Sequence, residues 1–231
     1  MTDYSWWTFF GTITATFVGA GLAFLSNQVA QRLTRRADNL AAGNVAMTTL
    51  SQQLGDYRNY ARAVREELEQ RSEIPLWIRI RPIPCSFDDT LRFDFEKLGF
   101  VFDNSPSLMG KLAVTQRRYF QLAKIAKLHF DTASDIQTRI SSKVEWRKLS
   151  ITDDMLRHEI GSAIVAQQAS LSELILEHVN RGEAEYMQMA DELYEALRKR
   201  FGSRFWGRKV TLLKIDRVNL LEQLEREVSN E

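Results

Sequence analysis

The first pattern along the chain is an uncharged run between Asp3 and Arg32. It opens with Trp6 and Trp7 and continues with apolar and small residues to about residue 31. A helix that crosses a bilayer needs roughly 20 mainly apolar residues, and aromatic side chains favour the headgroup layer. The pattern predicts a transmembrane helix within residues 1–31 and a second region over residues 32–231.

Two other interpretations of this run stay open. A secretory signal peptide would carry basic residues before its apolar stretch and a cleavage site after it. The leading segment has Asp3 and no Lys or Arg, and no convincing cleavage site follows. A buried core helix is the second alternative, because Gly11, Gly19 and Gly21 make the run only moderately hydrophobic.

Basic residues fix the expected orientation of the span. Arg32, Arg35 and Arg36 follow the uncharged run, whereas the segment before it has none. By the positive-inside rule the N-terminus lies outside and the C-terminal region in the cytoplasm. We therefore expect a single-pass membrane protein with a cytosolic C-terminal region and lipid as one partner.

The predicted span has two different faces. Trp6, Phe10 and Phe17 belong to one side, and small or hydroxyl-bearing residues lie opposite at helical spacing. Small residues four positions apart let helix backbones approach closely, and Thr hydroxyls can bond across helices or face water. The sequence predicts a homo-oligomer that assembles through a pore or oligomer face: Thr8, Gly11, Thr12, Ala15, Thr16, Gly19 and Ala23.

A seven-residue apolar repeat follows the span and predicts a long juxtamembrane helix over residues 32–72. Leu50, Tyr57 and Val64 add a second seam to the repeat. Such spacing is typical of a coiled coil or a helical bundle. Spacing alone does not decide whether the seam meets another subunit or later helices of the chain. The repeat is Leu33, Leu40, Met47, Leu54, Ala61 and Leu68.

Residues 74–104 form the only stretch where an alternating pattern replaces the helical one. Trp77–Arg81 and Leu91–Phe95 alternate between apolar and charged residues, and turn formers or prolines flank them. We expect a small two-stranded β insertion here. Arginines on exposed strands are usually solvated, and the alternative is that Arg79, Arg81 and Arg92 face a ligand.

Helical spacing returns at Ser105-Pro106 and predicts a bundle over residues 106–231. Pro106 suits the first position of a helix, and Thr152 resembles the N-cap of the next helix. Gly182 either divides this second segment or bends it. A last helix is expected from about Arg208 to Val228. The fold class is thus an all-α membrane protein with a cytosolic bundle and one small β insertion.

Candidate chemistry is sparse. The chain has 31 basic and 30 acidic residues, so no bulk attraction to nucleic acid is indicated. His129, His158 and His178 lack partners at metal-ligand spacing, and Cys85 has no His nearby in sequence. Phosphate-binding, dinucleotide and hydrolase motifs are absent. We expect no enzymatic activity, metal or cofactor.

One basic and aromatic segment stands out near the end of the bundle. Arginines grip phosphates and aromatic rings stack on bases, so the segment suits a nucleotide or oligonucleotide. It equally suits anionic lipid headgroups, or it is a helix C-terminus stabilised by basic residues. The candidate ligand-binding residues are Arg198, Lys199, Arg200, Arg204, Trp206, Arg208 and Lys209.

This layout, with its small span face and basic-aromatic segment, resembles small single-span membrane effectors of bacterial anti-phage systems, the Hailong-type effectors. The resemblance covers the layout of the whole chain and transfers no residue by position. It implies an oligomeric membrane channel that depolarises the cell and is regulated by an oligonucleotide from a partner enzyme. The alternatives are a membrane-anchored helical scaffold without a pore and, less favoured, a membrane-bound hydrolase.

Overall fold

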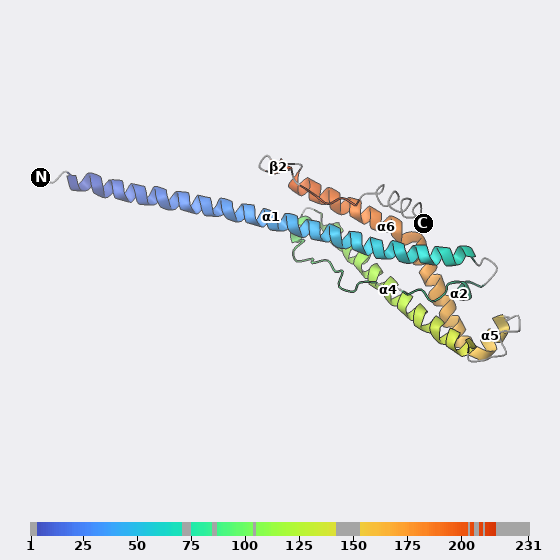
Figure 1. The fold of residues 1–231 in the computed structure, drawn as a ribbon. Coiled ribbons are helices and arrows are strands. Elements are labelled where there is room, and N and C mark those ends of the chain that lie inside the picture. Colours follow the sequence, from blue (N-terminus) through green and yellow to red (C-terminus); the bar gives the residue numbers. More distant parts are fainter. Residues whose placement is uncertain are drawn as a thin grey trace, which may run out of the picture.

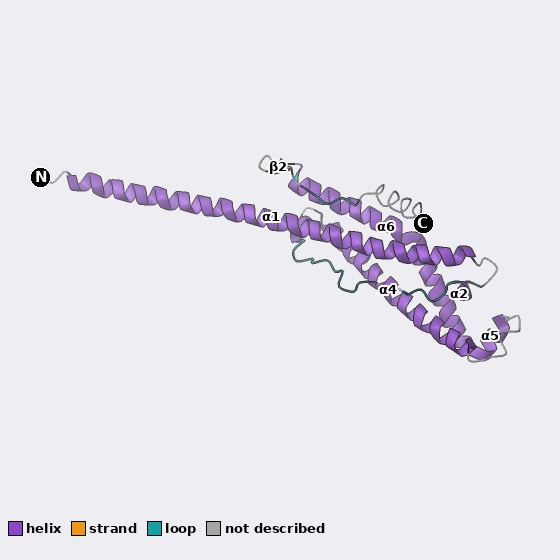
Figure 2. Cartoon of the chain, viewed as in Figure 1, coloured by secondary structure: helices purple, strands orange, loops and turns teal. Residues whose placement is uncertain are grey.

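The computed structural model shows one very long helix with a compact helical body packed on its second half. Figures 1 and 2 show the first half of α1 projecting alone from this body. The structure describes residues 4–70, 75–84, 87–103, 105–141, 153–202, 204–205, 208–209 and 211–215. Its elements are α1 (Tyr4–Gln70), α2 (Leu76–Arg79), α3 (Gly99–Phe102), α4 (Pro106–Ser141), α5 (Asp153–Ile160), α6 (Ser162–Phe201), β1 (Arg204–Phe205) and β2 (Arg208–Lys209).

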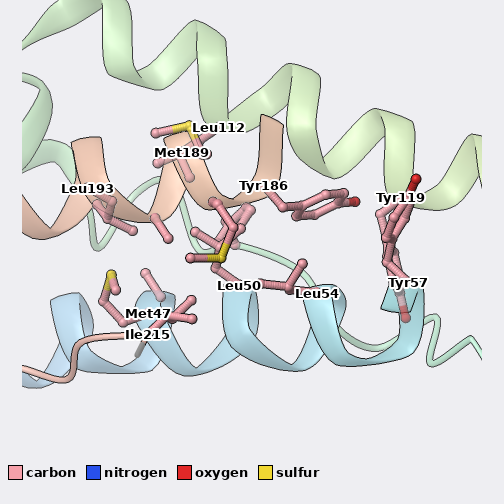
Figure 3. Close-up of a cluster of buried hydrophobic side chains, with 14 of the residues drawn as sticks. Met47, Leu50, Leu54, Tyr57, Leu112, Tyr119, Tyr186, Met189, Leu193 and Ile215 are labelled. Carbon is pink, nitrogen blue, oxygen red and sulfur yellow. The ribbon is translucent and has the colours of Figure 1, made fainter. Parts of the chain in front are cut away.

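The body is built around α6, which packs against both α4 and α1. Figure 3 shows the apolar side chains that meet between the three helices. The seven-residue repeat supplies the α1 side of this core, where Met47, Leu54 and Ala61 are buried, and the second seam is buried with it. The helix predicted over residues 32–72 is therefore present as far as Gln70, and its seam meets α6 of the same chain.

Two glycines let α1 and α6 approach closely. A Cβ atom on Gly182 of α6 would lie 2.6 Å from the ring of Tyr57 on α1, and one on Gly43 would lie 2.6 Å from a methyl group of Leu197. The Tyr57 hydroxyl donates to the backbone carbonyl of His178. Gly182 neither divides α6 nor ends it, since α6 is one helix from Ser162 to Phe201.

The predicted β insertion is wrong for the part of residues 74–104 that the structure describes. Residues 76–79 are helical, and Trp77 and Ile80 are both buried at the three-residue spacing of a helix. Leu91 and Phe93 are extended without a partner strand. The amide of Gln53 donates to the Leu91 carbonyl at 2.7 Å, and the Phe93 N–H donates to Gln116 Oε1 at 2.6 Å. Side-chain amides thus take the place of a second strand.

The helix expected from about Arg208 is also wrong over its described part. β1 and β2 pair antiparallel, with Arg204 opposite Lys209, and residues 211–215 are not helical. Here too a side-chain amide pairs with extended backbone. Asn44 Nδ2 donates to the Thr211 carbonyl at 3.2 Å, and the Leu213 N–H donates to Asn44 Oδ1 at 3.2 Å. Thr152 and residues 216–228 lie outside the described residues.

Candidate functional site

The most unusual surface of the protein is the apolar first half of α1. Every residue from Phe9 to Arg32 is exposed, and Phe17 reaches 75% exposure. These 24 positions correspond to roughly 36 Å of helix at 1.5 Å per residue, which exceeds a hydrocarbon core about 30 Å thick. Among the described helices, α1 is the one long and apolar enough to cross a membrane.

The predicted pore or oligomer face lies on this exposed segment, and its described side chains from Gly11 to Ala23 are all exposed. Extra Cβ atoms on Gly11 or Gly19 would meet no atom within 4 Å. Thr16 donates to the Thr12 carbonyl at 2.8 Å, so its hydroxyl proton is satisfied inside the helix and tolerates an apolar environment. Thr12, Ala15 and Ala23 are exposed as well, and the Thr8 side chain is outside the described part.

A basic collar surrounds the point where α1 leaves the body. Arg36 donates to the carbonyl of Phe201 at 3.0 Å, which places the C-terminal end of α6 beside the turns of α1 that follow its exposed apolar segment. Basic side chains that are far apart in sequence thereby share one end of the body, and all are exposed. The collar consists of Arg32, Arg35 and Arg36 from α1 and Arg198, Lys199 and Arg200 from α6.

The remaining predicted ligand-binding residues belong to the segment after α6. Arg204, Arg208 and Lys209 are placed only by the backbone of β1 and β2, and Trp206 lies outside the described residues. The backbone of this segment is nevertheless tied to α1, through the bonds of Asn44 to residues 211 and 213. It therefore lies on the same side of the body as the collar.

The arginines of the expected insertion are engaged within the chain. Arg81 lies 3.7 Å from a Glu67 carboxylate oxygen. Arg92 donates to the Asp89 carbonyl at 3.3 Å, and its guanidinium lies 5.0 Å from the centre of the Phe120 ring. Arg81 and Arg92 therefore have partners within the chain and need no ligand to explain their positions.

Histidines and carboxylates of the body also serve packing. His129 is 1% exposed, and its Nε2 lies 3.2 Å from the Ser172 hydroxyl. Burial lowers the pKa of His129 to about 4, because a charged imidazole would lose its hydration. His158 is exposed beside Glu159. Within the described residues, no three His, Cys, Asp or Glu side chains gather as a metal site.

Two of the cavities on the described part of the body are large enough for a small molecule, and sequence reasoning identified neither. The larger, about 680 Å³, lies between α1 residues 38–49 and the segment 92–100. The other, about 470 Å³, lies between α2, α4 and α6. Gln168 lines this second cavity, is 0% exposed, and has no hydrogen-bond partner for either amide atom. Its sequence signal is a polar residue on the apolar stripe of Ile164, Leu171 and Ile175.

Comparison with known proteins gives no family assignment. No protein-family model, curated protein or solved structure matches the chain.

Proposed function

We propose that this protein is a homo-oligomeric, single-span membrane effector of the bacterial inner membrane. In this proposal the α1 spans assemble into a gated pore, and the cytosolic body sets whether the pore conducts. Opening depolarises the cell. The observation that carries the proposal is the exposed apolar half of α1, where extra Cβ atoms on Gly11 and Gly19 would meet no atom within 4 Å, although one side of the second half of the same helix is buried in the body.

Assembly is supported by a stripe of small residues that runs along α1 from the span into the cytosol. From Thr16 to Ala41 its members follow one another at alternating steps of four and three residues, and Thr48 follows one heptad later, which is the spacing at which two parallel helices meet. None is charged, although Arg32, Arg35, Arg36 and Asp38 lie in the same stretch, and all are exposed. The stripe is Thr16, Ala20, Ala23, Asn27, Ala30, Thr34, Ala37, Ala41 and Thr48.

Coupling between body and pore is supported by the continuity of α1. The helix has no break between the span and the core, so a tilt or rotation of the body turns the span with it. Two exposed apolar side chains, Val45 on α1 and Leu213 beside Asn44, lie next to the cytosolic part of the stripe. A partner helix on the stripe would cover them.

The basic collar supports the proposed orientation and favours lipid headgroups as its anionic partner. Arg36 follows Val29 by seven residues, which is roughly 10 Å of helix. That distance is close to the screening length of about 8–10 Å at physiological salt. Basic residues at such a surface contribute about 1 kcal/mol each with anionic lipid. The collar then holds the body against the cytoplasmic leaflet.

The test is membrane potential, followed by voltage-sensitive dye in cells that express the full chain, with and without phage infection and the neighbouring genes. Gly11→Leu/Gly19→Leu fills the proposed contact face without a clash inside the subunit. Gly21→Leu is the control, because it makes the same chemical change about 160° around the helix from Gly19 and about 80° from Gly11. We expect depolarisation with wild-type protein and Gly21→Leu, and none with the double variant.

Equal depolarisation by all three proteins would refute assembly through this face. Absence of depolarisation under every trigger would refute the pore and leave the membrane-anchored scaffold. In that case cross-linking of the α1 stripe in intact membranes would still report whether the subunits associate.

A further inference from the structure

The 470 Å³ cavity has the make-up of a small-molecule site and lies far along the chain from the span. Its walls come from α2, the residues that follow α2, four residues of α4 and Gln168 of α6. Protein interiors are packed with few voids larger than a water molecule, whereas ligand sites of about 300–1,000 Å³ are typical. The lining is mostly apolar: Trp77, Ile78, Ile80, Pro82, Ala133, Ile136 and Ile140, with Gln137 and Arg81 at exposed positions.

The cavity wall contains an unpaired polar group. Gln168 has both a donor, Nε2, and an acceptor, Oε1, and neither has a hydrogen-bond partner among the residues that the structure describes, although the residue is completely buried. Its neighbour Ser172 donates to the backbone carbonyl of Gln168, not to the side chain. Buried polar side chains nearly always have a partner, so a group from outside the chain is the natural partner for this amide.

Charge and shape restrict what this partner is. Arg81 is the one charged residue of the lining, and it is exposed and lies 3.7 Å from Glu67. The cavity itself therefore suits a neutral molecule. The indole of Trp77 and the branched chains of Ile136 and Ile140 favour a flat apolar body. The side-chain amide of Gln168 offers one N–H donor and one carbonyl acceptor side by side. A cis-amide in a ligand presents its own acceptor beside its own donor, so the two amides can form a pair of hydrogen bonds.

We propose that this cavity binds a neutral, planar heterocycle with a cyclic amide edge, and that Gln168 recognises that edge through two hydrogen bonds. Rotation about the side-chain torsions of Gln168 turns the amide from the wall into the cavity. The flat body of the ligand lies against Trp77 and the isoleucines of α4. The site joins α2 to the α4–α6 pair and depends on neither the pore nor the orientation of the span.

The experiment is ligand-observed saturation-transfer NMR on the full chain in lipid nanodiscs, with empty nanodiscs subtracted. The probe is quinolin-2(1H)-one, and its N-methyl derivative is the matched ligand, because it keeps the ring system and loses the N–H donor. Guanosine, which carries a cyclic amide on a nucleoside, distinguishes a nucleoside source from a free heterocycle. Gln168→Leu removes both polar atoms, and Gln167→Leu makes the same change at an exposed neighbour.

Wild-type protein and Gln167→Leu are expected to bind quinolinone about tenfold or more tightly than its N-methyl derivative, as a site built for a donor discriminates against its loss. Gln168→Leu is expected to bind the two equally, and to unfold at the same temperature as wild type or higher, because it removes an unpaired buried amide. Ala133→Phe, which fills the cavity, is expected to bind neither.

Two results would overturn the proposal. One is the absence of saturable quinolinone and guanosine binding to wild-type protein. The other is an unchanged preference for quinolinone over its N-methyl derivative in Gln168→Leu, which would place recognition elsewhere. The comparison of the two ligands on wild-type protein stands even if a variant fails to fold.

Discussion

The contact between Gly182 and Tyr57 gives a quantitative test of the packing that joins α1 to the body. In Gly182→Ala the new methyl group would lie 2.6 Å from the Cε2, Cζ and hydroxyl oxygen of Tyr57. Tyr57 is 2% exposed and its hydroxyl is bonded to the His178 carbonyl, so the ring has little room to move. Overpacking of this kind costs about 1–3 kcal/mol.

Helix propensity acts in the opposite direction. Replacing Gly by Ala inside a helix stabilises it by about 1 kcal/mol, so we expect a net loss of up to about 2 kcal/mol for Gly182→Ala. Gly55→Ala is the control, because Gly55 lies within α1 and has nothing within 4 Å of a new methyl group. It should gain close to the full 1 kcal/mol. Gly43→Ala should fall between the two, since the end of the flexible Leu197 side chain can yield.

The assay is urea unfolding of the full chain in mild detergent, followed by circular dichroism, with midpoints and slopes compared among the three variants and wild type. Gly55→Ala should raise the midpoint and Gly182→Ala should lower it. A Gly182→Ala protein as stable as Gly55→Ala would refute the close approach of α6 to Tyr57. Gly182→Ala should also weaken the mechanical connection between the body and the first half of α1, because it disturbs the contact between Gly182 and Tyr57.

Two further predictions concern protonation and lipid contact. The pKa of His129 is about 4 in the folded chain against 6.5 ordinarily, so its contribution to stability is complete above pH 6.5 and is lost as the pH falls toward 4. Between pH 7 and 5.5 the loss of stability is about 1 kcal/mol. His129→Gln should flatten this part of the profile of stability against pH, whereas the control His158→Gln should leave it unchanged. Identical profiles for wild type and His129→Gln would refute the burial of His129. Trypsin should cut at Arg198, Lys199 and Arg200 several-fold more slowly in anionic than in neutral nanodiscs, because the collar contacts headgroups, and high salt should remove the difference. Equal cleavage rates would place the collar away from the bilayer surface.

The helices were predictable because their patterns are local. An uncharged run between Asp3 and Arg32 and the repeat from Leu33 to Leu68 are properties of neighbouring residues in one helix. The start of α4 at Pro106 follows from the fixed backbone angle of proline. These features determine where α1 and α4 begin and which side of α1 is buried.

Where the predictions failed, a side chain from a distant segment satisfied the backbone. The alternating pattern around Leu91 and Phe93 predicts a strand. In the structure the backbone groups of these two residues bond to the side-chain amides of Gln53 and Gln116 instead of to a second strand. The segment after α6 reads as a helix, yet Asn44 holds residues 211–213 extended. A polar residue's partner is not encoded in the spacing of its own segment.

Sequence alone thus determined the helices with repetitive patterns and the long apolar first half of α1. Tertiary structure decided that the α1 seam meets α6 of the same chain, that Arg36 and the end of α6 share one collar, and that Gln168 is buried without a partner. The physical reason is the separation along the sequence of the residues that interact. Periodicity records which side of a helix avoids water, whereas the partner on that side and the satisfaction of each polar group depend on residues brought together only by folding.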